Sequence, residues 1–555
     1  MMEMSGAELI VRLLERQGIR TIAGIPGGAI LPLYDALAAS TEIRHVLARH
    51  EQGAGFIAQG MARVSGRPEV CFASSGPGAT NLVTAIADAR LDSIPLIAIT
   101  GQVPLSMIGT DAFQEVDIYG MTVPVTKHNF LVRSAHELLD VIPEAFRIAM
   151  SGRPGPVLVD VPKDVQNQRV QFEAWPQPVV AEPNRPLDLK AIEEAAQMIN
   201  DAEQPVLYLG GGVVHSGASA LAVTLAEQAG LPTTTTLMAL GTMPSDHPLS
   251  IGMLGMHAAR YTNFVLEEAD LLICVGARFD DRAIGRAAQF CPRARIIHID
   301  IDPSEHNKIK AAHVAIQGDV GQVLEALLPR IKVRLRKRWL SHVDSLKARF
   351  PLQMPGLEDA RSHYGLIQAV AACLDDDAIV TTDVGQHQMW VAQAYPFGRE
   401  RQWLTSGGLG TMGFGLPAAI GAALAAPERT VVCFSGDGSI KMNIQELATL
   451  AEEGLKVKIV LMNNQSLGLV YQQQNLFYGK RVFASKYRGA PDFTKIAEGF
   501  GIQSLDLDQV QNPRAALAQA LAAPGPCLIH ASIDREQFVY PMVPPGAANT
   551  EMIGG

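Results

Sequence analysis

Short apolar runs alternate with helical patterns along the whole chain. Residues 431–434 and 457–462 are two such runs, and their length and continuous hydrophobicity predict strands buried in a parallel sheet. Between them, Ile444 and Leu447 start an apolar spacing typical of a helix, and Gly454 is placed to end it. Units of strand, helix and strand recur in this way, which predicts an α/β fold with doubly wound parallel sheets.

Two proline-rich stretches, residues 172–189 and 338–362, are predicted linkers that divide the chain into three blocks of similar size. The first and third blocks echo each other, because each has Val-Cys-Phe immediately before a glycine-rich turn, and this favours two related domains. We expect the three domains and a C-terminal tail at residues 1–171, 190–331, 360–535 and 536–555.

In the middle block, three predicted strands end in glycine or aspartate, a pattern typical of nucleotide-binding domains. The residues at these ends are Gly210, Gly211, Gly212, Gly276, Ala277, Arg278, Asp300 and Asp302. The GxGxxG fingerprint is absent, so an α/β spacer without a ligand is nearly as good an interpretation of this block.

Composition narrows the functional classes. The chain has 555 residues, of which 48% are hydrophobic and 18% charged, and its net charge is -10. Such a chain lacks the concentrated basic face of a nucleic-acid-binding protein, and the basic run at residues 332–338 is expected to be an exposed helix face. The six cysteines form no CxxC pair and are expected to be buried and reduced. With neither a signal peptide nor a membrane span predicted, we expect a cytoplasmic protein.

Gly436, Asp437, Gly438 and Ser439 follow one predicted strand, and Asn464 follows the next. The carboxyl ends of parallel strands share the ligand-binding edge of a sheet, so these residues are expected to meet there. An aspartate oxygen, an asparagine carbonyl and a nearby backbone carbonyl suit Mg²⁺ that holds a diphosphate. A Gly-Asp-Gly turn alone would be an ordinary turn, but the paired asparagine favours the metal site.

Two further stretches contain candidate chemistry. Glu51 follows a predicted strand, where it is either a partly buried functional carboxyl or a structural residue at a helix start. Residues 407–415 are so rich in glycine that their backbone must approach a ligand or another helix closely. Met412 among them either fills a gap in the core or forms a wedge under a bound ring.

At another predicted strand end, His387 is either a phosphate contact or a helix cap. Residues 276–282 mix arginines with aspartates, which is typical of a surface ion-pair network. The alternative is that one arginine clamps a substrate carboxylate with its planar, bidentate guanidinium.

Together these segments resemble a thiamine-diphosphate enzyme, and more narrowly the large catalytic subunits of acetohydroxyacid (acetolactate) synthase, closest to the enterobacterial isozyme I type. The resemblance covers nearly the whole chain, through residues 24–28, 49–53, 75–81, 109–115, 151–156, 161–164 and 407–417. It implies an N-terminal pyrimidine-binding domain, a central FAD-binding domain and a C-terminal domain that binds diphosphate and Mg²⁺.

The resemblance implies a role for each matching residue. Glu51 would contact the aminopyrimidine of thiamine diphosphate, and Met412 would hold the cofactor bent, with the Gly410 carbonyl facing its amino group. Asp437, Asn464 and the Ser466 carbonyl would bind Mg²⁺. The other implied cofactor contacts are Gln386, His387, Gly436, Gly438 and Ser439. Implied for the substrates are Gly28, Phe113, Gln114, Lys163 and Gln473, with Arg282 as the partner of the second substrate's carboxylate. Implied for FAD are Arg153, Gly210, Gly211, Gly212, His257, Gly276, Arg278, Asp300, Asp302 and Asp319.

The implied activity is the decarboxylation of pyruvate on thiamine diphosphate and condensation of the product with pyruvate or 2-ketobutyrate. This is the first common step of valine, leucine and isoleucine biosynthesis. The thiazolium ring is the electron sink for the departing CO₂, so FAD would be structural. The resemblance also implies a homodimer with active sites at its interface and a small regulatory subunit.

One residue departs from the family pattern. Many members have tryptophan where this chain has Gln473, and that tryptophan is associated with preference for 2-ketobutyrate. An apolar wall favours one extra methylene by about 1–3 kcal/mol, which glutamine cannot match. We therefore expect weak discrimination between the two acceptors, and altered herbicide sensitivity.

Three rival interpretations remain open at this point. A pyruvate oxidase-like enzyme would use FAD for electron transfer. Glyoxylate carboligase is disfavoured because that family lacks a counterpart of Glu51, and intact Glu51, Asp437 and Asn464 disfavour a catalytically silent scaffold.

The tail at residues 543–551 is expected to be either an active-site cover or a frayed terminus.

Overall fold

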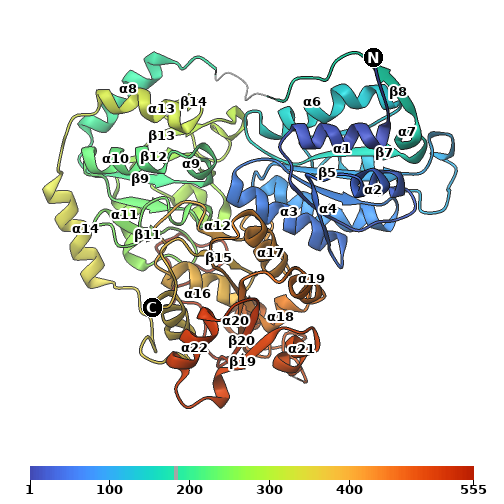
Figure 1. Cartoon of the computed structure of the whole chain (residues 1–555). Coiled ribbons are helices and arrows are strands. Elements are labelled where there is room, and N and C mark those ends of the chain that lie inside the picture. The colour runs from blue at the N-terminus through green and yellow to red at the C-terminus, as the bar shows by residue number, and fades with distance from the viewer. Residues whose placement is uncertain (180–184, 490, 555) are drawn as a thin grey trace.

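The computed structural model describes residues 1–179, 185–489 and 491–554, so residues 180–184 of the first predicted linker lie outside the described part. Three six-stranded sheets form the described chain, one in each predicted block, and every strand pair within them is parallel. Figure 1 shows the blue N-terminal and green central regions side by side, with the orange and red C-terminal region against both. The predicted doubly wound α/β fold is confirmed.

The N-terminal sheet has the strand order β3-β2-β4-β5-β7-β6. Its strands are β2 (Thr21–Gly24), β3 (Arg44–Leu47), β4 (Glu69–Ala73), β5 (Leu96–Gln102), β6 (His128–Leu131) and β7 (Val157–Pro162). The helices of this region are α1 (Gly6–Arg16), α2 (Leu31–Ala38), α3 (Glu51–Ser65), α4 (Pro77–Leu91), α5 (Ile118–Thr122), α6 (Leu138–Met150) and α7 (Lys163–Asn167). A separate antiparallel pair joins β1 (Met2–Ser5) to β8 (Arg169–Phe172).

The C-terminal sheet has the order β16-β15-β17-β18-β20-β19, which repeats the N-terminal topology strand for strand. Its strands are β15 (Ile379–Thr382), β16 (Trp403–Leu404), β17 (Val431–Gly436), β18 (Val457–Asn463), β19 (Gln503–Asp506) and β20 (Cys527–Ser532). Its helices are α15 (His363–Ala371), α16 (Gln386–Ala394), α17 (Gly415–Ala425), α18 (Asp437–Ile440), α19 (Glu446–Glu453), α20 (Gly468–Phe477), α21 (Phe493–Gly499) and α22 (Pro513–Ala522). The two regions that echo each other in sequence therefore share one fold.

The central sheet differs, with the order β11-β10-β9-β12-β13-β14 that is typical of dinucleotide-binding sheets. Its strands are β9 (Pro205–Leu209), β10 (Thr233–Thr235), β11 (Ser250–Met253), β12 (Leu271–Val275), β13 (Arg295–Asp300) and β14 (Val314–Gln317). Its helices are α8 (Leu189–Asp201), α9 (Gly211–Ser216), α10 (Ser219–Ala229), α11 (Arg260–Glu268), α12 (Asp281–Ile284), α13 (Val320–Leu327) and α14 (Lys337–Arg349).

The second predicted linker is partly wrong, because its first residues form α14. Trp339, Val343 and Leu346 are buried on one face of that helix against the central region. The dense charges around them hide this apolar stripe in the sequence. The basic run before it is not an exposed helix face either, because the helix begins only at Lys337 and Arg336 is buried. Burial lowers the pKa of Arg336 to about 10.

The N- and C-terminal sheets share one continuous core, in which α3 packs against α17. Glycines allow the close approach: a Cβ on Gly60 would lie 2.2 Å from the Ala418 carbonyl oxygen, and one on Gly421 would lie 2.0 Å from that of Ile57. Because Ile57 faces Gly421 and Gly60 faces Ala418, the two helices run in opposite directions. The start of α3 therefore lies at the far end of this contact from the start of α17.

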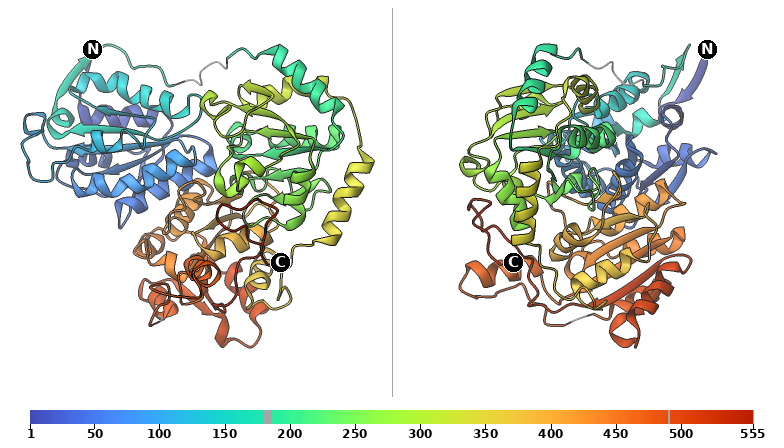
Figure 2. Two further views of the ribbon diagram at one scale, coloured as in Figure 1. Left: turned by 180° about the vertical axis from the view of Figure 1, so that it is seen from behind. Right: turned by 90° about the vertical axis from the view of Figure 1, so that its left-hand side faces the viewer.

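The C-terminal tail leaves β20 and crosses to the central region (Figure 2). Its Val543 amide donates to the Met256 carbonyl at 2.9 Å, and Asn263 donates to the Asn549 carbonyl at 3.1 Å.

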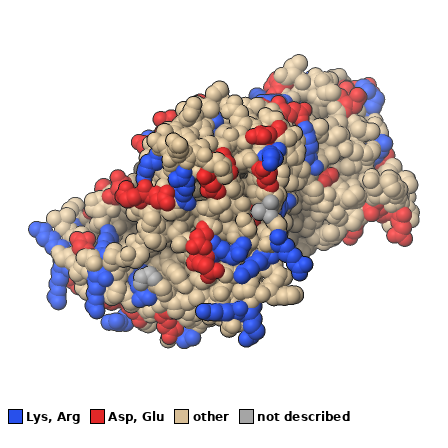
Figure 3. Space-filling view, turned by 90° about the horizontal axis from the view of Figure 1, so that it is seen from below, with Lys and Arg blue, Asp and Glu red and all other residues tan. Residues whose placement is uncertain are grey.

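Seen from below, acidic and basic side chains are interspersed among broad uncharged areas (Figure 3). Within the described ranges, no helix has both the length and the apolar composition needed to span a membrane.

Candidate functional site

The carboxyl ends of β17 and β18 bring Asp437 and Asn464 together. The Asn464 backbone amide donates to the Asp437 carboxylate at 3.4 Å, and the Lys441 ammonium group approaches the same carboxylate at 4.0 Å. Asp437 is only 2% exposed, and burial raises its pKa to about 6, although the Lys441 cation opposes that rise. A buried carboxyl that its neighbouring cations do not fully compensate is suited to a metal ion that would restore its ionised form.

Polar side chains extend this cluster along the sheet edge. The Asn464 side-chain carbonyl accepts from the Ser466 amide at 3.1 Å and from its hydroxyl at 2.9 Å. The Asn464 amide group donates to Gln386 at 2.9 Å, and Gln386 donates to Gln472 at 3.0 Å. The predicted metal ligands and Gln386 therefore lie in one hydrogen-bonded group.

His387 is buried beside the same edge. Its ring would lie 2.9 Å from a Cβ on Gly436, so only glycine fits at that position. Burial lowers the pKa of His387 to about 3, which keeps the imidazole neutral. Its Nε2 has no partner among the described residues, and a buried polar atom of this kind is suited to a ligand.

The glycine-rich segment, residues 407–415, lies next to this edge. A Cβ on Gly438 would lie 3.6 Å from the Met412 methyl group, so Met412 points toward the Gly-Asp-Gly turn. The Gly413 amide donates to buried Asp383 at 2.7 Å, and the Ser439 hydroxyl donates to the Val384 carbonyl at 2.6 Å. Gly410 has a positive φ of 71° and is exposed, which leaves its backbone open to a ligand.

Glu51 begins α3 at the carboxyl edge of the N-terminal sheet. Its carboxylate accepts from Asn81 at 2.9 Å and would lie 3.3 Å from a Cβ on Gly78. His50 caps the helix by accepting from the Gln52 amide at 3.1 Å. The position of Glu51 is thus fixed by α3 and by the start of α4.

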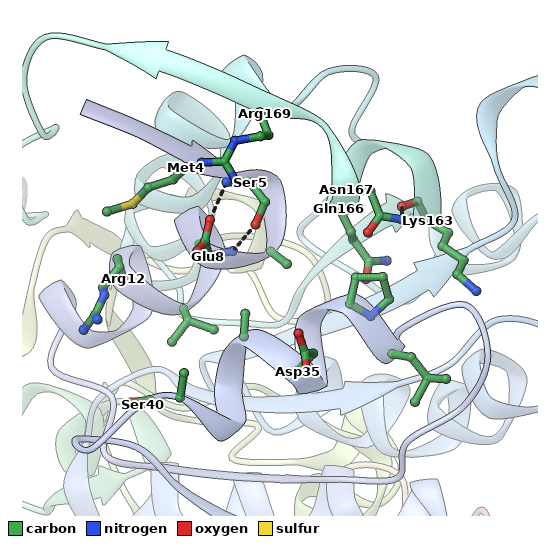
Figure 4. Close-up of a pocket in the computed structure, with 16 residues that line it drawn as sticks. Met4, Ser5, Glu8, Arg12, Asp35, Ser40, Lys163, Gln166, Asn167 and Arg169 are labelled. Carbon is green, nitrogen blue, oxygen red and sulfur yellow. Dashed lines mark hydrogen bonds between the residues drawn. The ribbon is translucent and has the colours of Figure 1, made fainter. Parts of the chain in front are cut away.

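Four of the predicted substrate residues belong to the N-terminal region, at the same edge or its margin. The Gln114 carbonyl oxygen would lie 2.7 Å from a Cβ on Gly76, close to the Glu51 site, and Gln114 has a positive φ of 61°. Phe113 is 88% exposed, and Gly28 faces open space. Lys163 lies at the edge of a separate cavity of about 570 Å³ beside α1 and α2 (Figure 4).

Helix α3 extends from Glu51 toward the glycine-rich segment of the same chain. Arg63, near the end of α3, lies 4.9 Å from the Phe414 ring beside Met412. Glu51 is twelve positions earlier on that helix, which separates it from Arg63 by roughly 18 Å along the axis. Phe56, five positions after Glu51, also lies 5.3 Å from the Phe414 ring, so α3 contacts the glycine-rich segment of its own chain through both residues.

A cavity of about 800 Å³ lies at the carboxyl ends of the central strands and reaches the N-terminal region. Glycines shape its wall: a Cβ on Gly210 would lie 2.3 Å from the Gly276 carbonyl oxygen, and one on Gly212 would lie 2.7 Å from the Gly276 Cα. Its lining includes most of the residues predicted for FAD, namely Arg153, Gly211, Gly212, Gly276, Arg278, Asp300, Asp302 and Asp319. Burial raises the pKa of Asp300 to about 6.

Arg153 links the two regions that border this cavity. It donates to Ser93 at 2.8 Å and to Glu305 at 3.0 Å. His257, also predicted for FAD, lies away from the cavity lining and is 3.2 Å from the Pro541 carbonyl oxygen. Burial lowers its pKa to about 4.

Arg282 and Gln473 lie beside the C-terminal tail. Arg282 is exposed on α12 and 3.8 Å from Asp281, as in the expected surface network. Half-buried Gln473 follows Gln472, whose side chain accepts from the Val539 amide at 2.9 Å. The tail is thus anchored next to both residues.

Sequence reasoning missed a buried ionic cluster and Glu446. Arg63, Asp88 and Asp92 form the cluster between the N-terminal region and the glycine-rich segment. The available signal was a pair of aspartates four positions apart, Asp88 within α4 and Asp92 directly after it. Glu446 on α19 accepts from the His50 amide at 3.0 Å, and no local pattern indicates this partner.

Three family models match the chain, one in each region. Residues 4–121 match the thiamine pyrophosphate enzyme N-terminal TPP binding domain, residues 192–327 the central domain and residues 383–531 the C-terminal TPP binding domain.

Curated relatives extend the match over almost the entire chain. Acetolactate synthase isozyme 1 large subunit of Escherichia coli (strain K12) is 64% identical over 552 residues, covering 99% of this chain and 98% of that protein. The isozyme 2 large subunit of the same organism is 48% identical and covers 99% of each chain. Probable acetolactate synthase 2, chloroplastic, of Oryza sativa subsp. japonica is 46% identical, covering 99% of this chain and 86% of that protein. The chain therefore belongs to the acetolactate synthase large subunits, a family of thiamine pyrophosphate enzymes.

Proposed function

We propose that this chain is a catalytic acetolactate synthase, which decarboxylates pyruvate and joins the remaining two-carbon unit to a second 2-keto acid. This reaction is the first common step of branched-chain amino acid biosynthesis. The observation that carries the proposal is the intact cluster of Asp437, Asn464 and Gln386 in a chain 64% identical to a named acetolactate synthase subunit. We also propose that the domains cover residues 1–171, 190–331 and 360–535.

Thiamine diphosphate and Mg²⁺ fit the C-terminal edge. The buried Asp437 carboxyl, the Asn464 carbonyl and the Ser466 backbone supply oxygen ligands of the kind that Mg²⁺ prefers. Glycines and the unpartnered His387 Nε2 leave room and a polar contact for phosphate. When bound, thiamine diphosphate supplies the electron sink for decarboxylation.

The side chains of this chain would position the cofactor and the substrates and would exchange protons with them. We assign to Glu51 the proton exchange at the aminopyrimidine ring, because its carboxylate lies at a ligand-binding edge with one side-chain donor, Asn81. Met412 would support the ring, and the Gly410 carbonyl would face it. We assign Gln114, Phe113, Gly28 and Lys163 to the path of the substrates, and Arg282 to the acceptor carboxylate.

FAD fits the central cavity. Its volume of about 800 Å³, its glycine wall and its mixture of arginines and aspartates suit a dinucleotide with a pyrophosphate and ribose hydroxyls. The condensation needs no net oxidation, so we assign FAD a structural role in this chain.

A homodimer would complete the active site. The antiparallel contact of α3 with α17 puts Glu51 and the start of α17 at opposite ends of that contact, so we assign the other half of the site to a second copy. Large apolar side chains are exposed near both halves, among them Phe113, Met442 and Phe483. Such exposure is typical of surfaces that bind another chain.

The choice of acceptor and a regulatory partner also belong to the proposed function. Gln473 lies beside the anchored tail. We propose that, with glutamine at this position, the enzyme discriminates only weakly between pyruvate and 2-ketobutyrate as acceptors. We also propose a small regulatory subunit as a partner, because the relatives are named large subunits.

The test is pyruvate conversion by purified protein, with thiamine diphosphate, Mg²⁺ and FAD omitted one at a time. We expect acetolactate without any electron acceptor, and loss of activity when any cofactor is left out. Pyruvate-dependent reduction of a quinone, with no acetolactate, would instead indicate an oxidase and would refute the proposal.

A further inference from the structure

A buried ionic cluster separates the central cavity from the glycine-rich segment. The Arg63 guanidinium lies 2.8 Å from the Asp92 carboxylate and 3.5 Å from that of Asp88. All three side chains are almost fully buried, and the Arg63 guanidinium also lies against the Phe414 ring. Charges removed from water in this way are held by one another, so displacing one of them is costly to the others.

One side of the cluster holds the glycine-rich segment. The Asp92 carboxylate accepts from the Gly407 amide at 3.1 Å and from the Gly408 amide at 2.7 Å. The Asp88 carboxylate accepts from the Thr411 hydroxyl at 3.0 Å and from the Ser406 hydroxyl. The two carboxylates thereby fix the backbone on both sides of Gly410.

The other side of the cluster forms part of the cavity wall. Arg63 and Asp92 both line the cavity, as does Met238 from the central region. A Cβ on Gly407 would lie 2.2 Å from the Met238 sulfur, so this wall is one side chain thick. The Arg63 Nε has no hydrogen-bond partner among the described residues, although the side chain is buried.

These contacts give Asp92 two partners in different sites. It contacts the cavity on one side and the Gly407 and Gly408 amides on the other, with the Arg63 cation between it and Asp88. A ligand that fills the cavity packs against Arg63, Asp92 and Met238, and so restricts the wall between the two sites. The Gly407 and Gly408 amides, which are bonded to that wall through Asp92, are restricted with it.

We propose that the Arg63–Asp88–Asp92 cluster couples the two cofactor sites, so that a flavin nucleotide in the cavity raises the affinity of the glycine-rich segment for thiamine diphosphate. This inference rests on the proposed function, since it takes the two cofactors from there. Through this coupling, a flavin that takes no part in redox chemistry orders the segment around Gly410. Because coupling is reciprocal, thiamine diphosphate raises flavin affinity by the same factor.

The experiment measures both affinities in the full-length protein. FAD binding is followed by flavin fluorescence with and without thiamine diphosphate and Mg²⁺, and thiamine diphosphate binding by calorimetry with and without FAD. In the unsubstituted protein we expect each cofactor to strengthen the other by about 5–150-fold, the usual range for coupled sites. Both titrations are run where sedimentation shows a single oligomeric state.

Thr411→Val tests the cluster, because it removes a bond to Asp88 on the side away from the cavity. We expect FAD affinity without thiamine diphosphate to stay within about 2-fold, and the coupling factor to fall toward 1. Ser406→Ala, which removes the other hydroxyl, should do the same if Thr411→Val does not fold. Thr262→Val is the matched control, since this buried threonine on α11 lies outside the cluster and the cavity lining.

The outcomes separate this inference from the function on which it rests. If FAD or thiamine diphosphate does not bind the unsubstituted protein, the proposed function fails and the coupling with it. If both bind independently, or if the coupling factor is unchanged in Thr411→Val and Ser406→Ala, the coupling alone is refuted.

Discussion

Glu446 joins the C-terminal region to the segment that carries Glu51, and its loss tests how Glu51 is positioned. The fully buried Glu446 carboxylate accepts from the Arg49 amide at 3.1 Å, from the His50 amide at 3.0 Å and from the Thr449 hydroxyl at 2.7 Å. Glu446→Ala removes all three bonds at once. Two backbone amides immediately before Glu51 then have no acceptor.

The expected cost follows from those two amides. A fully buried donor left without a partner costs about 1–3 kcal/mol, and because these two amides are only partly buried, Glu446→Ala should lose about 2–4 kcal/mol of stability. We also expect turnover to fall by about 10²-fold, because a displacement of about 1 Å at a catalytic group has that effect. Glu446→Gln keeps an acceptor for both amides, and the Thr449 hydroxyl is free to rotate. That variant should lose only about 1 kcal/mol, the worth of an ordinary hydrogen bond.

The assay pairs thermal unfolding with the initial rate of acetolactate formation at saturating cofactors. Glu452→Ala is the matched control, because Glu452 is on the same helix and contacts Arg49 only through an exposed ion pair. Exposed pairs of that kind contribute about 0–1 kcal/mol. If Glu446→Ala matched Glu452→Ala in both measurements, the positioning role of Glu446 would be refuted.

Four further predictions concern other parts of the chain. Glu51→Gln should lower acetolactate turnover by about 10²–10⁴-fold without changing thermal unfolding, and an unchanged rate would exclude its proton exchange. Gly421→Ala places a Cβ 2.0 Å from a backbone oxygen of α3 and should cost about 1–3 kcal/mol in thermal unfolding, whereas Gly499→Ala, with open space around it, should not. His363 is buried with its pKa lowered to about 4, so the folded protein should lose about 2 kcal/mol between pH 6.5 and 5 as the unfolded histidine protonates; His363→Leu should remove that part of the acid loss from thermal unfolding curves. Gln473→Trp should raise the preference for 2-ketobutyrate by at least about 10-fold in competition assays with both acceptors.

Local sequence patterns predicted the strand ends well. A continuous apolar run followed by a polar residue locates both a buried strand and its ligand-binding end, as at β17 and β18. The helix between them ends at Gly454 as expected, because a glycine in the left-handed region caps its last turn. The edge that gathers Asp437 and Asn464 followed from strand order alone.

Contacts between regions were not predictable from the same patterns. Arg63 and Asp92 are far apart in sequence, and their partnership depends on how α3 packs against α4. The antiparallel packing of α3 on α17 likewise arises from the fit of glycines to facing carbonyls, which no sequence period encodes. The apolar stripe of α14 is short, because the helix covers only a small part of the central region. The many charged residues around that stripe hid it in the sequence.

The duplicated sheets give the chain two equivalent strand edges that carry candidate site residues. α3 precedes β4 and α17 precedes β17, so the two helices occupy equivalent places in sheets of identical strand order. Their contact is reciprocal, since Gly60 faces a carbonyl of α17 and Gly421 faces one of α3. Reciprocal contacts between equivalent elements are characteristic of two-fold symmetry, here between two halves of one chain. Because the paired helices are antiparallel, their starting ends point apart, and each start borders a ligand edge. Glu51 at the start of α3 and Gly415 at the start of α17 therefore lie at opposite ends of the contact, which is the arrangement on which the proposed homodimer rests.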